Sequence, residues 1–156
     1  QAEKMMLGSW LSPWEFNSTD KLVDTMVRAI VNQDQDEFII GIIGSSVAAG
    51  NGNCHYDNYP NQLERTLSPV WKAADMKLVI QNTGVGACGD SYSNEVYCIQ
   101  QSVSPQVDVI HYTWTLYESD KSLALESRES LIRWTQMMQH QPPVHDQCKV
   151  GFSLEE

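Results

Sequence analysis

The sequence predicts a single α/β domain: a three-layer α/β/α sandwich around a short parallel sheet of three to four strands. Residues 38–43 form an apolar, mostly β-branched run, which is typical of a strand buried on both faces. Two more short apolar runs follow at 77–81 and 107–114, and helix-like periodicity fills the intervals between the runs. The 156 residues are enough for one domain with a core and too few for two ordinary domains.

A first helix is predicted before the strand at 38–43. From Ser18 to Val31 the apolar side chains recur every three or four residues, so we expect an amphipathic helix that covers one face of the sheet. Ser18 or Asp20 is its expected N-cap. The polar stretch 32–37 then makes the turn into the strand.

The strand at 38–43 leads directly into Gly44, two serines and a run of small residues. Gly44 permits a tight turn, so Ser46 is predicted to lie at the carboxyl edge of the sheet. Open α/β sheets bind ligands at that edge, and backbone N–H groups at a helix start can hold a developing oxyanion. Ser46 is therefore the first candidate for a functional residue.

A second helix is predicted after the polar loop at 51–57. Asn58 can cap this helix, Pro60 suits its first turn, and Pro69 is expected to kink or restart it. Its apolar face is formed by Leu63, Leu67, Val70, Trp71 and Ala74.

The strand at 77–81 ends in a bend that contains Gly84. A glycine lets the backbone turn its N–H towards a substrate without a Cβ atom in the way, so Gly84 is the second candidate. A polar loop follows, and a helix is expected to end before Pro105. That helix includes Asn94, Val96, Tyr97 and Ile99.

The last helix is predicted at 119–140, where two prolines at 142–143 end it and Val144 and His145 open a fourth strand. Its apolar stripe consists of Leu131, Trp134, Thr135 and Met138. The chain thus divides into an aromatic N-terminal arm at 1–17, one domain at 18–150 and a tail at 151–156. The arm is expected to pack on the domain or on a protein partner. Because the chain starts with Gln1, we expect a processed or partly covered chain.

Charge and composition exclude several classes of function. The net charge is −10 and the ten basic residues are scattered, which excludes binding to nucleic acid or to an anionic membrane surface. No apolar run reaches about 18 residues, so no membrane span is predicted. Residues 44–50 lack the lysine of a P-loop and the spacing of a dinucleotide fingerprint, so no nucleotide cofactor is predicted.

The four cysteines lack the Cys-x-x-Cys spacing of zinc or redox sites, so no metal is predicted. Cys88 and Cys98 flank the polar loop and are the first candidate disulfide; Cys54 and Cys148 are the second. Asn17 begins an Asn-Ser-Thr glycosylation sequence. Together these features predict the secretory pathway, the extracellular space or an organelle lumen. The alternative is an intracellular protein with buried free thiols.

Two blocks of the sequence resemble the SGNH (GDSL-type) hydrolases. Residues 44–50, Gly-Ser-Ser-Val-Ala-Ala-Gly, resemble the first block of that family, Gly-Asp-Ser-x-x-x-Gly, with Ser45 in place of the aspartate. The resemblance implies that Ser46 is the nucleophile. Residues 82–84, Asn-Thr-Gly, resemble the second block, which implies that the Gly84 N–H is an oxyanion donor. The resemblance implies a flavodoxin-like fold, of which the family has a version with a five-stranded sheet.

The resemblance to the family covers residues 38–118. Within it, the sequence most resembles SGNH-like proteins of diatoms and related algae, whose chains continue past residue 150. The chain is therefore expected to be a fragment or a shortened relative. Two family blocks depart from the pattern. Tyr117 stands where the third block has its asparagine, an oxyanion donor.

The base that the family supplies from an Asp-x-x-His block is also missing. Asp108 and His111 have that spacing, but residues three apart on a strand point to opposite faces, so they are rejected as a pair. Of the other histidines, His140 ends a helix and His145 starts a strand. His55, in the loop after the serine turn, is the best remaining candidate for the base.

Two functions follow from this resemblance. The favoured hypothesis is a catalytically degenerate SGNH-like domain that serves as a structural or binding subunit of a larger assembly, because the base is missing and the third block is altered. The alternative is a serine ester or acyl hydrolase that acts on acylated carbohydrate or lipid.

Overall fold

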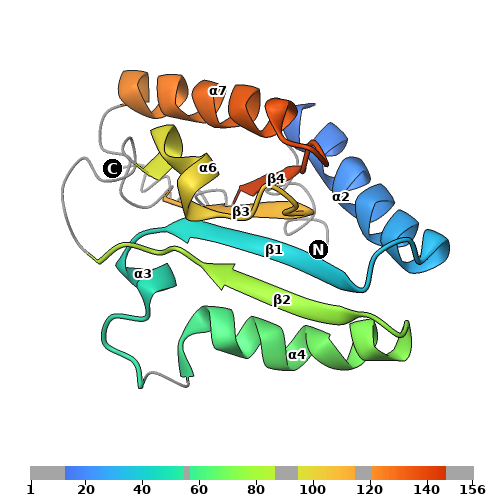
Figure 1. The fold of residues 1–156 in the computed structure, drawn as a ribbon. Helices are drawn as coiled ribbons and strands as arrows, with labels where there is room; N and C mark the ends of the chain where they lie inside the picture. The colour runs from blue at the N-terminus through green and yellow to red at the C-terminus, as the bar shows by residue number, and fades with distance from the viewer. Residues whose placement is uncertain (1–12, 55–56, 87–94, 115–120, 147–156) are drawn as a thin grey trace, which may run out of the picture.

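One sheet of four parallel strands organises the molecule, for which a computed structural model describes residues 13–54, 57–86, 95–114 and 121–146 (Figure 1). The strand order is β2-β1-β3-β4, and every neighbouring pair is parallel. The strands are β1 (Glu37–Gly44), β2 (Lys77–Asn82), β3 (Val109–Thr113) and β4 (Val144–Asp146). The predicted parallel sheet is confirmed, including its short fourth strand.

The central strand β1 is buried on both faces, as its composition predicts. Its even-numbered residues pack against α2 (Pro13–Asn32) and α4 (Tyr59–Ala73). Its odd-numbered isoleucines, Ile39 and Ile43, pack against α6 (Ile99–Ser102) and α7 (Lys121–Met137). Figure 1 shows α4 on one side of the sheet and α6 and α7 on the other. The three-layer α/β/α sandwich is therefore confirmed.

Helix α2 starts earlier than expected. It begins at Pro13, so neither Ser18 nor Asp20 is its N-cap, and residues 13–17 of the predicted arm belong to this helix. Proline is tolerated in a first helical turn because the N–H that it lacks has no acceptor there. Asn17 also lies within α2. Residues 1–12 of the arm and the tail at 151–156 lie outside the described residues.

Helix α4 starts as predicted. The Asn58 side chain accepts a hydrogen bond from the Asn61 N–H at 2.9 Å, and Pro60 lies in the first turn. Pro69 does not restart the helix, which runs through it to Ala73. Val70 was wrongly assigned to the apolar face: its side chain is exposed, because the adjacent Trp71 takes the buried position and stacks on Phe38.

The helices on the other face of the sheet largely agree with those predicted from the sequence. The helix predicted before Pro105 is short: α6 has four residues and follows a helical turn at 95–97. Leu131 and Thr135 of α7 are buried, as is Met138 directly after the helix, which confirms the predicted stripe. No helix among the described residues is long and apolar enough to cross a lipid bilayer.

Neither predicted disulfide is formed. Cys54 and Cys98 are both exposed free thiols, and each proposed pair contains one of them. Their proposed partners, Cys148 and Cys88, lie outside the described residues. Spacing along the chain fixes only the length of the loop that a disulfide would close, whereas the bond requires that two Cβ atoms face each other at short range. The secretory or luminal location therefore loses one of its supports and stays a prediction.

Candidate active site at the carboxyl edge of the sheet

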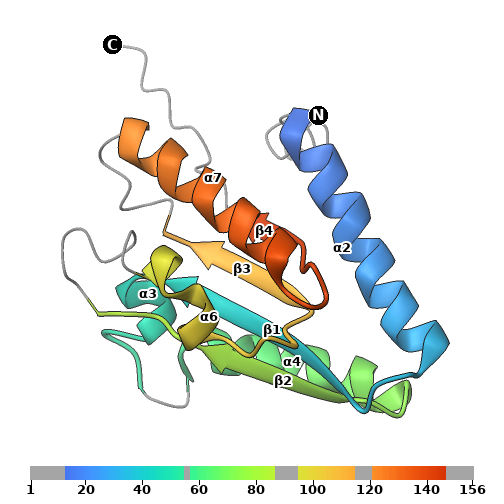
Figure 2. The same cartoon turned by 45° about the horizontal axis from the view of Figure 1, so that its top comes forward.

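Ser46 lies at the carboxyl end of the central strand. It is the first residue of α3 (Ser46–Ala49), a single helical turn that follows Gly44 and Ser45 directly. Figures 1 and 2 show α3 at the end of the sheet to which the arrowheads of β1 and β2 point. The turn closes through backbone bonds, since the Ser46 carbonyl accepts the Asn51 N–H at 2.9 Å. Gly50 ends the turn with φ of 83°, a left-handed conformation that favours glycine.

The bend at Gly84 packs directly on this serine turn. The Val85 N–H donates to the Gly44 carbonyl at 2.8 Å, and the Asn82 side-chain amide donates to the Ala48 carbonyl at 2.8 Å. A Cβ atom on Gly84 would lie 2.6 Å from the Ala49 nitrogen, so only glycine permits this approach. The two bends singled out from the sequence are therefore in contact at one edge of the sheet, as parallel neighbouring strands require. Their catalytic roles stay predictions.

The Gly84 amide is engaged within its own bend. Its N–H donates to Oδ1 of Asn82 at 3.0 Å. Asn82 thus ties the bend together with its oxygen and ties the bend to α3 with its nitrogen. An oxyanion bound by the Gly84 N–H would have to replace or share the Asn82 oxygen. The sequence analysis identified Asn82 only as part of the second sequence block and did not predict this structural role.

Asp108 and His111 do not form a catalytic pair, as expected. Asp108 lies at the amino edge, where its carboxylate accepts the Ile39 N–H at 2.7 Å and contacts Nδ1 of His140 at 3.1 Å. It also accepts from Gln35 at 3.2 Å. Strand β3, which is five residues or about 16 Å long, separates this edge from the edge with the serine turn.

His111 uses both ring nitrogens inside the sheet. Its Nε2 lies 2.8 Å from Oη of Tyr59 and its Nδ1 lies 2.8 Å from Nδ1 of His145. Burial, and secondarily the charge of His145, lower the pKa of His111 to about 4, so its imidazole is neutral at pH 7. Since both nitrogens have partners, His111 is not placed to take a proton from Ser46. The remaining sequence candidates, His55 and Tyr117, lie outside the described residues.

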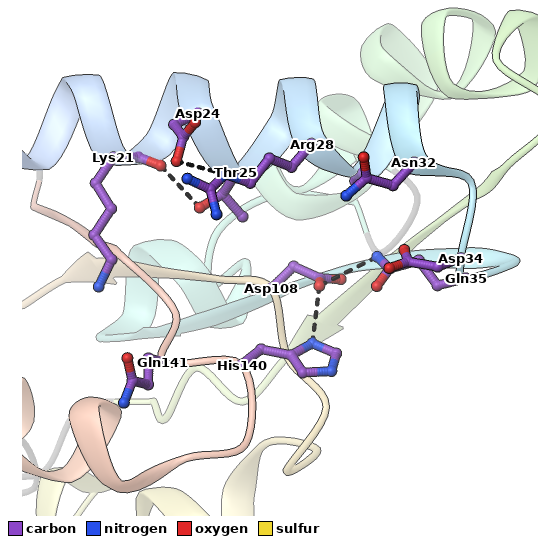
Figure 3. Close-up of a pocket in the computed structure, with 11 residues that line it drawn as sticks. Lys21, Asp24, Thr25, Arg28, Asn32, Asp34, Gln35, Asp108, His140 and Gln141 are labelled. Atoms are coloured by element: carbon purple, nitrogen blue, oxygen red, sulfur yellow. Dashed lines mark hydrogen bonds and ion pairs between the residues drawn. The ribbon is translucent and has the colours of Figure 1, made fainter.

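A polar cavity of about 470 Å³ lies at the opposite edge of the sheet (Figure 3). Lys21 and Arg28 of α2 line one side, and Asp108, His140 and Gln141 line the other. The described lining contains no serine or cysteine nucleophile, and both oxygens of its buried carboxylate, Asp108, already have hydrogen-bond partners. The candidate site is therefore the carboxyl edge and not this cavity. The described residues contain no group of three or more side chains arranged to hold a metal ion.

Sequence reasoning also missed Glu95. This residue is buried directly beneath the two bends, and its carboxyl group contacts Thr83 and Trp114. The only signal in the sequence is one acidic residue next to apolar Val96 in a predicted helix, a pattern equally typical of a solvated helix face.

The fold is similar to that of solved esterases. A two-domain esterase (CEX) active on acetylated mannans matches with a TM-score of 0.67 and 17% identity, over 81% of this chain and 33% of that chain. AlinE4, an SGNH-hydrolase family esterase, matches with a TM-score of 0.55 and 16% identity, over 72% of this chain and 59% of that chain. The chain therefore has an SGNH-like fold, as the resemblance implied.

The chain spans only about a third of the length of the mannan esterase and somewhat more than half of AlinE4. No protein-family model and no curated protein sequence matches the chain. The similarity to algal proteins stays a prediction.

Proposed function

We propose that this chain carries the nucleophile side of an SGNH-type serine ester hydrolase site, with acylated carbohydrate as the substrate class. One observation carries the proposal: Ser46 opens a helical turn at the carboxyl edge, and the Gly84 bend packs against that same turn. Two esterases with this fold support the reaction class, and the one active on acetylated mannans supports an O-acetyl carbohydrate ester.

The proposed reaction uses few groups of this chain. Oγ of Ser46 attacks the ester carbonyl, and a general base takes the hydroxyl proton. The negative charge that develops on the carbonyl oxygen is held by the backbone N–H groups of Ser46 and Gly84. The base then returns the proton to the departing alcohol, and water releases the acyl group from Ser46. His55 is the candidate base because the loop that holds it follows the serine turn.

Hydrolysis of p-nitrophenyl acetate and of acetylated mannan tests this proposal. Ser46→Ala is expected to lower the rate by roughly 10³-fold or more, because it removes the nucleophile. The matched control is Ser45→Ala, one residue away: Ser45 is 2% exposed, and its hydroxyl has no hydrogen-bond partner among the described residues. A fluorophosphonate should label the wild type and Ser45→Ala but not Ser46→Ala. Hydrolysis that survives Ser46→Ala contradicts the proposal.

A second candidate function is a non-catalytic SGNH-like domain that binds a ligand or a protein partner. Two observations favour it. Tyr117 stands where the resemblance to the family predicts the asparagine donor, and both His111 and His140 have hydrogen-bond partners within the fold. A partner would contact the aromatic N-terminal arm predicted at 1–17. A secretory or luminal location is proposed for either function.

The two candidates give different results with one ligand. Under the second candidate, calorimetry detects binding of acetylated mannan oligosaccharides or of a partner protein, while the acetyl groups remain and the fluorophosphonate leaves Ser46 unlabelled. Release of acetate that depends on Ser46 contradicts this candidate.

A further inference from the structure

A buried carboxyl group joins the ends of three strands beneath the candidate site. Glu95 is 6% exposed, and Oε2 accepts a hydrogen bond from the indole N–H of Trp114, which follows β3. Oε1 lies 2.8 Å from the hydroxyl of Thr83, which follows β2. The backbone N–H of Gly44, the last residue of β1, is a further hydrogen-bond partner. The described contacts of this carboxyl group therefore reach all three strand ends.

The contacts of the Thr83 hydroxyl are compatible with a protonated Glu95. The Thr83 hydroxyl lies 3.0 Å from the Ile42 carbonyl and 2.8 Å from Oε1 of Glu95. A hydroxyl has one proton, and a carbonyl oxygen can only accept. Each contact is a separate two-centre hydrogen bond if Thr83 donates to Ile42 and accepts from a protonated Glu95; with an ionised Glu95, the single Thr83 proton would be shared between the two acceptors. The geometry thus fits a neutral carboxylic acid.

The electrostatics agree with this assignment. Burial is the largest effect and raises the pKa of Glu95 to about 7, although hydrogen bonds that Trp114, Thr83 and Gly44 donate to the ionised form act in the opposite direction. At neutral pH and below, a large share of the molecules therefore carry the acid form, which can donate to Thr83.

Each contact of Glu95 lies beside a residue of the proposed site. Gly44 is two residues before Ser46, and Thr83 is the residue before Gly84. We propose that Glu95 is a positioning residue, whose buried carboxyl group fixes the serine turn and the Gly84 bend relative to each other. Its role in hydrolysis rests on the proposed function, whereas its role in holding the strand ends does not. Glu95 does not touch the substrate in this proposal.

Three variants test the proposal. Glu95→Ala removes every contact of the carboxyl group. Glu95→Gln keeps an acceptor for Trp114 and supplies an N–H for Thr83, so it reproduces the neutral acid. The control, Asp108→Asn, makes the same change of carboxyl to amide in a buried side chain at the amino edge of the sheet.

Two measurements are made on each variant: amide hydrogen exchange at Gly44 and Val85, and the kinetics of p-nitrophenyl acetate hydrolysis. Glu95→Ala should speed exchange at both amides and lower kcat by about 10- to 100-fold with little change in KM, since a small displacement of reacting groups costs that much. Glu95→Gln should restore both. Asp108→Asn should change neither, even where it lowers stability.

The outcomes separate this inference from the proposed function. If the wild type neither hydrolyses esters nor reacts with a fluorophosphonate, the proposed function fails, and hydrogen exchange alone decides the role of Glu95. If Glu95→Ala leaves Gly44 and Val85 protected, or Glu95→Gln fails to restore the protection, the positioning role is overturned. An equal loss of activity in Asp108→Asn also overturns it, because the effect would then be one of stability.

Discussion

Adjacent residues of the serine turn have opposite environments. Ser46 is partly exposed at the edge of the sheet, whereas Ser45 is 2% exposed and its hydroxyl has no partner in the described part of the chain. An unsatisfied buried hydroxyl costs roughly 1–3 kcal/mol. Ser45→Ala should therefore preserve or slightly raise the stability of the protein, which makes it a sound control for Ser46→Ala.

Gly84 is required for a steric reason and not for an unusual backbone angle. A Cβ atom there would lie 2.6 Å from the Ala49 nitrogen and 2.7 Å from the Ala48 carbonyl carbon. We expect Gly84→Ala to push the bend away from α3 and to lower the free energy of unfolding by about 1–3 kcal/mol. Urea denaturation measures this change.

The matched variant is Gly86→Ala. Among the described residues, the atoms nearest to a Cβ on Gly86 belong to the Asn51 side chain, the first at 3.1 Å, and a side chain can move aside. Gly86→Ala should therefore cost less than Gly84→Ala. Equal losses in the two variants would argue against a specific contact between Gly84 and α3.

At the scale of the elements, the start of α4 depends on one side chain. Asn58 is buried and accepts the Asn61 N–H, which has no acceptor inside the helix. Asn58→Ala should lower the free energy of unfolding by about 1 kcal/mol, the usual cost of a lost N-cap. Asn58→Asp keeps an acceptor and should lose less; denaturant titration of both variants would show whether the cap is responsible.

At the scale of the whole molecule, two buried titratable groups act on stability in opposite directions with pH. Burial lowers the pKa of His111 from 6.5 to about 4, so the unfolded chain takes up its proton first. This stabilisation is present above pH 6.5, and about 3 kcal/mol of it is lost as the pH falls to 4. Burial raises the pKa of Glu95 from 4.5 to about 7, so its contribution is present below pH 4.5 and is lost as the pH rises to 7.

The two contributions offset each other between pH 4.5 and 6.5, so single variants should separate them. Relative to the wild type, His111→Gln should gain stability as the pH falls from 6.5 to 4, because its amide does not titrate. Glu95→Gln should gain stability relative to the wild type as the pH rises from 4.5 to 7. Urea denaturation at several pH values measures both differences. A difference that does not change with pH would show that the group has no shifted pKa.

Strands β1 and β3 could be predicted from the sequence because burial on both faces favours short apolar runs rich in β-branched residues. Helix α4 could be predicted because the Asn58 cap and the spacing of its apolar side chains are local signals. The start of α2 could not be predicted, because it depends on residues outside the periodic pattern. The exposure of Val70 could not be predicted either, because it depends on which side chain packs against Phe38.

The sequence by itself determined the α/β class, the parallel strands and the location of Ser46 and Gly84 at strand ends, because these depend on residues that are neighbours in the chain. Only the tertiary structure decided that the two bends touch, that Cys54 and Cys98 are unpaired, and that His111 bonds Tyr59 and His145. It also placed Glu95 between three strand ends. Each of these facts joins segments that are distant in sequence, and no local pattern records which distant groups will meet when the core forms.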